Sequence, residues 1–132
     1  MLPEMTKSER EVMRLLWNSS EPLSCTEIIN ASPDKHWKDS YIHHIVNDLI
    51  KKGYIKIVAF EQVSRVYTRK FAPTMDWGTF VLHQVFTPEQ LADRDYMFEI
   101  WRKLIMAVED VHIINEIERI IKDYKRRIEH NF

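Results

Sequence analysis

Residues 37–71 read WKDSYIHHIVNDLIKKGYIKIVAFEQVSRVYTRKF, and the succession of patterns in this stretch decides the fold. Apolar residues recur at i, i+3, i+4, i+7 and i+8, the spacing that places side chains on one face of a helix. They are Ile42, Ile45, Val46, Leu49 and Ile50. Gly53 follows them, as is typical of a helix C-cap. The pattern predicts a helix from about Asp39 to Lys52.

The opposite face of this predicted helix is polar. Its members hydrogen-bond or carry charge, and they are Ser40, Tyr41, His43, His44, Asn47 and Lys51. Beyond the helix, residues 54–60 have strand composition, residues 61–64 are predicted as a polar tip, and residues 65–71 alternate as a second strand. A packed helix with a polar face, followed by a basic hairpin, is typical of a winged helix-turn-helix. In that fold the helix enters the DNA major groove and the hairpin reaches the flanking backbone.

Two helices are expected before this segment, because two capping boxes precede it. Thr6 and Glu9 open a helix over about residues 7–17. A second Ser-x-x-Glu box at Ser24 opens a shorter helix that ends near residue 31. The predicted fold class is therefore mainly α, with three helices and a two-stranded wing followed by a helical region.

The remainder of the chain, residues 74–132, reads as helix throughout. Thr87 and Pro88 mark a clear helix start, with Thr as the N-cap and Pro at the first helical position. Apolar residues then step by three and four in a heptad-like seam. The seam residues expected at a dimer interface are Trp101, Ile105, Ile114, Ile117, Ile121, Tyr124 and Ile128. Either Asp110 caps a break between two helices or one helix runs through, and the pattern does not decide between them.

This tail carries more bulky apolar side chains than it buries on itself. We expect it to pack against a second copy of the chain in a two-fold homodimer, with intrachain packing of its isoleucine stripe as the alternative. Two symmetric recognition helices would then meet two half-sites of a palindrome, about one DNA turn apart. The predicted domains are residues 1–73 for DNA binding and residues 74–132 for dimerisation.

The composition argues against several other classes of protein. Cys25 is the only cysteine, so no intrachain disulfide is expected and a reducing cytoplasm is the simplest compartment. No apolar run approaches the roughly 20 residues that cross a bilayer. The two glycines make no phosphate loop, and the sequence has no metal-ligand spacing or nucleophile elbow. We therefore expect no enzyme activity, no cofactor and no metal site.

Local charge is more informative than the net charge of −1. Residues 51–70 carry six lysines and arginines against Glu61, and phosphate binding depends on such local excess. The predicted phosphate contacts are Lys51, Lys52, Arg65 and Arg69. The predicted base contacts are Ser40, Tyr41, His43, His44 and Asn47. Lys38, just before the helix, is also expected on the DNA-binding surface.

Several residues together resemble the penicillinase-repressor family of winged-helix regulators (BlaI/MecI/CopY). The first helix carries Thr6, Glu9, Glu11, Val12, Met13 and Trp17. Later matching positions are Trp37, Ile42, Val46, Leu49 and the run Lys52-Gly53-Tyr54-Ile55. The resemblance covers about residues 3–73 and implies a homodimeric repressor of bacterial promoters. This chain differs from the usual family pattern at Lys38-Asp39, where Ser-Pro is usual, and at Asp48, where Arg is usual.

Two other functions remain open from the sequence. Winged helices also serve as protein-interaction modules, and the near-neutral charge with Asp48 beside the polar face favours that reading. A ligand-responsive sensor is the third possibility, with a small-molecule pocket in the tail lined by Trp77, Phe80, Trp101 and Met97. An inducer or a sensor protein is a further partner that the sequence leaves unidentified. Trp37 and Cys25 are expected to pack rather than to bind.

Overall fold

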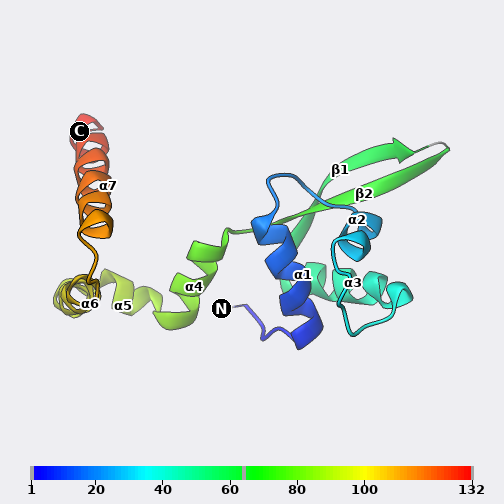
Figure 1. The fold of residues 1–132 in the computed structure, drawn as a ribbon, viewed down its shortest axis with the longest axis horizontal. Helices are drawn as coiled ribbons and strands as arrows, with labels where there is room; N and C mark the ends of the chain where they lie inside the picture. The colour runs from blue at the N-terminus through cyan, green and yellow to red at the C-terminus, as the bar shows by residue number, and fades with distance from the viewer. Residues whose placement is uncertain (1, 64, 132) are drawn as a thin grey trace. The chain divides into compact units, whose positions relative to one another are not determined.

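The computed structural model describes residues 2–63 and 65–131. The chain forms two compact units, residues 1–85 and residues 86–132. Figure 1 labels the elements of both units along the chain. The first unit contains α1 (Lys7–Asn18), α2 (Cys25–Asn30), the 3-10 turn η1 (Asp39–Tyr41), α3 (Ile42–Lys52), β1 (Ile55–Val63), β2 (Val66–Pro73) and α4 (Trp77–Val85). The second contains α5 (Pro88–Ala92), α6 (Arg94–Met106) and α7 (Val111–His130).

The capping boxes predicted for the first two helices are confirmed. The Thr6 hydroxyl accepts a hydrogen bond from the Glu9 amide, and the Glu9 carboxylate accepts one from the Thr6 amide. Both donor–acceptor distances are 3.2 Å. Ser24 and Glu27 make the same reciprocal pair at the start of α2. Each box satisfies two amides that the first turn of a helix leaves without partners.

The third helix begins and ends for reasons that are visible in the sequence. Its first turn, from Asp39, is a 3-10 turn rather than α-helix, so the α-helix itself starts three residues later than predicted. Gly53 ends it with φ of 86°, a left-handed conformation that glycine adopts without a Cβ clash. The Tyr54 amide then donates to the Leu49 carbonyl at 2.9 Å, which closes the helix end.

The wing is an antiparallel pair of strands with a shorter tip than predicted. Gln62 pairs with Tyr67 and Val63 with Val66, so most of the predicted tip over residues 61–64 is part of the ladder. Ser64, the last residue of that predicted tip, lies outside the described residues. The prediction was wrong because side-chain polarity marks a loop only loosely, while cross-strand backbone pairing continues through polar residues.

One hydrophobic core holds the first unit together. It combines residues from α1, α2, α3 and both strands, and its members are Met5, Val12, Met13, Leu16, Ile28, Trp37, Ile42, Ile45, Val46, Leu49, Tyr54, Ile55 and Phe71. Trp37 is buried among them, which confirms its expected packing role. Leu23 adds a third backbone segment to the sheet through two hydrogen bonds with Phe71, of 3.0 and 2.9 Å.

The fourth helix packs on the first unit through aromatic side chains. The Phe80 ring lies 5.0 Å from the Trp17 ring and 5.9 Å from the Tyr54 ring. The Trp17 indole also donates to the Met75 carbonyl at 2.9 Å. By these contacts α4 belongs with residues 1–85, while the functional division after residue 73 stays a prediction.

The second unit is helical, and the question left open at Asp110 is resolved as a break. The Asp110 carboxylate caps α7 by accepting a hydrogen bond from the His112 amide at 2.8 Å. Thr87 caps α5 as predicted, with Pro88 as the first helical residue. Within residues 86–131, Met97 alone is buried. None of the described helices is both long and apolar enough to span a membrane.

Candidate nucleic-acid interface

The third helix turns its apolar stripe inward and its polar face outward. Ile42, Val46 and Leu49 are almost completely buried, and a helix with one face packed must present the other. The predicted base-contact residues are all exposed: Ser40, Tyr41, His43, His44 and Asn47. Lys38 and Lys51 are exposed at the two ends of the same segment. The structure thus brings these predicted residues together on one surface.

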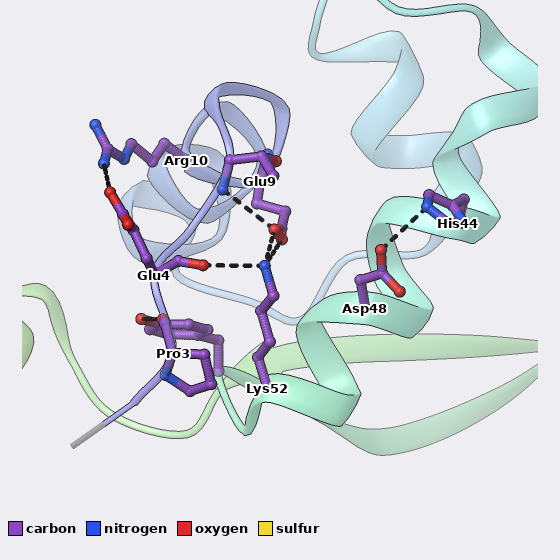
Figure 2. Close-up of polar contacts among 9 residues, drawn as sticks. Pro3, Glu4, Glu9, Arg10, His44, Asp48 and Lys52 are labelled. Carbon is purple, nitrogen blue, oxygen red and sulfur yellow. Dashed lines mark hydrogen bonds and ion pairs between the residues drawn. The ribbon is translucent and has the colours of Figure 1, made fainter.

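Three residues of this polar face interact with one another. The His44 Nε2 atom lies 3.1 Å from the Asp48 carboxylate, one helical turn away (Figure 2). The Tyr41 ring packs against the His44 ring with centroids 4.9 Å apart. Asp48 thus contacts a neighbour on the same helix, one turn away, rather than a residue of another element.

Lys52 differs from the other predicted contacts because its ammonium group is paired with a buried carboxylate. It contacts both carboxylate oxygens of Glu9, one at 2.9 Å, and donates to the Glu4 carbonyl at 3.0 Å (Figure 2). The Glu9 side chain is only 3% exposed. Lys52 therefore joins the end of α3 to the start of α1, and we leave it out of the proposed phosphate contacts.

The same ion pair sets the protonation of Glu9. Burial by itself would raise the pKa of this carboxyl group, since water stabilises its charged form better than protein does. The hydrogen bonds and positive charge of Lys52, with the bonds to Thr6, outweigh burial and leave the pKa below its ordinary value. Glu9 is therefore an ionised group at neutral pH, held by a cation on another helix.

The wing contributes some free cations and one that is paired. Lys70 lies 3.0 Å from Glu61 and 3.0 Å from Glu27, and these bonds raise the pKa of its ammonium group. Among the described residues, the basic side chains of this region that make no ion pair are Lys51, Lys56, Arg65 and Arg69. All four are exposed. The Arg69 guanidinium also lies 5.4 Å from the Phe71 ring centre.

A small cavity of about 270 Å³ separates the wing from α3. It is lined by Cys25, Thr26, His43, Tyr67, Thr68, Arg69 and Phe71. The Cys25 sulfur lies 3.9 Å from the His43 Nδ1 atom, and burial raises the pKa of the thiol. A thiol with a raised pKa is a poor nucleophile, so the half-buried Cys25 acts as a small packing residue at the core edge.

Sequence reasoning missed the wing residues beside His43. Tyr67 and Thr68 sit next to this part of α3 because β2 crosses the same side of the fold. The alternating pattern predicted that both residues belong to a paired strand, but it did not indicate which helix they would contact. No group of three metal-ligating side chains occurs within residues 2–63 and 65–131.

The second unit has an apolar groove of about 640 Å³ between α6 and α7. Four predicted dimer residues line it, namely Trp101, Ile105, Ile117 and Ile121, together with Val108 of the same predicted seam and the unpredicted Leu104 and Ile120. The other predicted residues, Ile114, Tyr124 and Ile128, lie on α7 outside the groove lining. Leu104 and Ile120 lie three residues after Trp101 and Ile117, so a wider apolar stripe on each helix would have included them.

The four residues suggested for a pocket in the tail fall into different units. Trp77 and Phe80 line a cleft in the first unit. Met97 and Trp101 belong to the second unit. The suggested set of four is therefore not a cluster within either unit.

Comparison with known proteins gives one family match. The model of the penicillinase repressor family matches residues 5–86, which is more than half of the chain. An uncharacterized 16.5 kDa protein from Latilactobacillus sakei is 40% identical over 53 residues. That alignment spans 40% of this chain and 36% of the relative.

Two solved structures are similar at low sequence identity. A mutant of MepR from a multidrug-resistant S. aureus clinical isolate is 15% identical, with a TM-score of 0.43 over 95% of this chain and 78% of that one. The structure of GAS PerR-Zn-Zn is 14% identical, with a TM-score of 0.41 over 53% of this chain and 44% of that one.

Proposed function

Because the chain belongs to the penicillinase-repressor family, we propose that it is a sequence-specific repressor that binds a palindromic operator as a homodimer. Family membership makes it a DNA-binding transcriptional regulator rather than an enzyme. The observation that carries the proposal is the geometry of α3, whose apolar stripe is buried while its polar face is open. DNA is in the cytoplasm of a bacterium, and we place the protein there.

The base contacts are assigned to the polar face of α3. Ser40, Tyr41 and Asn47 offer hydroxyl and amide groups, which pair with base edges in the major groove. His44, three residues from both Tyr41 and Asn47, and His43, four residues before Asn47, add ring nitrogens. A good bidentate contact, of the kind that the Asn47 amide can make with adenine, contributes about 1–3 kcal/mol of discrimination against a wrong base.

The phosphate contacts are assigned to four exposed cations that form no ion pair with any residue that the structure describes. Lys38 and Lys51 flank the polar face, and Arg65 and Arg69 lie on the wing. These side chains do not give up an ion pair to bind DNA, whereas Lys52 would have to leave the buried Glu9 carboxylate unpaired. The number of free cations is small, so a single chain would bind DNA modestly and two linked copies would bind more tightly.

The homodimer is assigned to the second unit. Its helices leave large apolar side chains open to water, including Phe98 at 70% exposure and Trp101 at 56%. Contiguous apolar surface of this kind is typical of an interface. The groove between α6 and α7, which Ile105, Ile117 and Ile121 help to line, would accept apolar side chains of a second copy. A two-fold arrangement gives each copy the same contacts.

Selection of bound sequences from a random duplex pool tests the proposal. The expected product is an inverted repeat with half-sites about one DNA turn apart. Sedimentation of the free protein should show a dimer, and repression of a reporter by the selected operator should depend on binding. If no sequence is enriched, specific DNA binding is rejected. The better-supported function would then be that of a protein-interaction module, which the Asp48 carboxylate beside the polar face favours.

Single substitutions distinguish the proposed phosphate contacts from the proposed base contacts. Arg65→Ala should weaken binding to all duplexes alike and lower the salt slope by about 0.9 unit, because one phosphate contact is lost. His43→Ala should change the selected bases instead. Lys122→Ala, on the exposed surface of α7, is the matched control and should change neither. An unchanged salt slope for Arg65→Ala would remove the wing from the interface.

A further inference from the structure

The first unit contains a cleft that neither the DNA interface nor the dimer surface uses. It has a volume of about 310 Å³ and lies between α1 and α4. A stripe on α1 forms one wall, with Arg10, Arg14 and Trp17 at i, i+4 and i+7. A stripe on α4 forms the other, with Trp77, Phe80 and Gln84 at i, i+3 and i+7. Helical spacing therefore directs both sets of side chains toward each other.

The floor of the cleft is aromatic, and its polar atoms are already satisfied. The Trp17 indole donates to the Met75 carbonyl and the Tyr54 hydroxyl donates to the Pro3 carbonyl. The Phe80 ring packs against both Trp17 and Tyr54. These rings consequently offer apolar faces to whatever enters, and the hydrogen bonds fix their positions.

The rim of the cleft is cationic. Arg14 forms no ion pair within the part of the chain that the structure describes, and Arg10 has only a 4.0 Å contact with the largely exposed Glu4. Two guanidinium groups thus face one carboxylate, which leaves the lining with an excess positive charge. A planar guanidinium binds a carboxylate through two parallel hydrogen bonds, so Arg14 is suited to that group in particular.

Trp77 adds an exposed aromatic surface beside Arg14. Its side chain is 62% exposed although it begins α4. A second cavity of about 220 Å³ adjoins the first and is lined by Arg14, Trp17, Asn18 and Trp77. Arg14, Trp17 and Trp77 line both spaces, so one guanidinium group and two indole rings border the combined cleft.

We propose that the cleft between α1 and α4 binds a small planar aromatic carboxylate. The carboxylate pairs with Arg14, and the aromatic ring stacks on Trp77 above the floor formed by Trp17 and Phe80. The volume lies at the lower end of the roughly 300–1,000 Å³ of small-molecule sites, which fits one or two fused rings. A bound carboxylate would bridge the two helices and stabilise the packing of α4 on the first unit.

Titration calorimetry of the full chain, without DNA, tests this site with 2-naphthoate and its neutral analogue 2-naphthamide. We expect naphthoate to bind at least tenfold more tightly than naphthamide. Arg14→Gln should abolish the difference, while Trp77→Ala should weaken both probes. Arg102→Gln is the matched control, because among the described residues Arg102 pairs with Glu99 on α6 alone, and it should change neither affinity.

The indole N–H signals in heteronuclear NMR locate the probe independently of affinity. Naphthoate should shift the signals of Trp17 and Trp77 and leave those of Trp37 and Trp101 in place. Equal affinity for the two probes, a preference retained in Arg14→Gln, or absence of binding up to about 5 mM naphthoate would each overturn the proposal. Shifts confined to Trp101 would do the same, because they would place the probe in the second unit.

Discussion

The ion pair between Glu9 and Lys52 gives the most decisive prediction, because it separates a structural lysine from a DNA-binding one. Replacing Lys52 with Met removes the cation and keeps most of the apolar stem. The Glu9 carboxylate, 3% exposed, would then retain only its bond from the Thr6 amide. Removing one partner from a buried pair costs about 3–5 kcal/mol. The Lys52 side chain is itself 25% exposed, so we expect about 3 kcal/mol, the lower end of that range.

The reciprocal substitution, Glu9→Gln, should reduce the free energy of unfolding by less. In Glu9→Gln the Lys52 ammonium keeps the Glu4 carbonyl at 3.0 Å and some access to water. The amide oxygen of Gln still completes the capping box. We expect a loss of about 2 kcal/mol, and the double variant should lose at least 1.5 kcal/mol less than the sum of the single losses.

Urea unfolding of the four proteins in this cycle, followed by tryptophan fluorescence and circular dichroism, provides the free energies. Lys125→Met is the control, because its 4.0 Å pair with Glu129 lies on the exposed surface of α7 and should contribute less than about 0.5 kcal/mol. Additive losses, or a loss below about 1 kcal/mol for Lys52→Met, would refute the reasoning. The reasoning would also be refuted if Lys52→Met kept its stability while the salt slope of its DNA binding fell by about one unit, because that fall is the signature of a lost phosphate contact.

Three further outcomes follow from the same structure. The lowered pKa of Glu9 adds stability at pH values above its unfolded value of 4.5, and this contribution should be lost as the pH falls through the folded pKa. In urea unfolding, the free energy of Glu9→Gln should therefore depend less on pH below 4.5 than that of the unsubstituted protein. Gly53→Ala should destabilise the fold by about 1 kcal/mol in urea unfolding, because φ is 86° there, while the nearest side-chain atom of Leu2 at 3.4 Å leaves room for the methyl group. Ile121→Asp should convert the dimer to monomer in sedimentation experiments, since it places a charge in the apolar groove, whereas the exposed Lys122→Asp should remain dimeric.

The elements that form the proposed DNA interface follow from local sequence rules. The stripe through Ile42 and Leu49, the caps at Thr6 and Ser24, and the stop at Gly53 all involve residues within one or two helical turns of one another. Local spacing and backbone preference act over that range, so these features could be predicted before any contact was known. The exposure of the polar face then follows from the burial of the opposite stripe.

The partners of the charged residues could not be predicted in this way. Lys52 meets Glu9 across 43 positions of sequence, and Lys70 meets Glu27 across a similar distance. The sequence pattern could not distinguish the two lysines, because both belong to the basic segment over residues 51–70. Which cations remain free for phosphate depends on which carboxylates the packed helices bring near, and that is a property of the tertiary arrangement.

The sequence by itself determined the helices of the first unit, the wing and the face that α3 leaves open, because periodicity and capping act between near neighbours. Only the tertiary structure decided that Lys52 pairs with Glu9 of α1, that α4 packs on Trp17, and that Arg14 and Trp77 line one cleft. These contacts join segments that are distant along the chain, and their geometry is fixed by how the core packs rather than by any local preference.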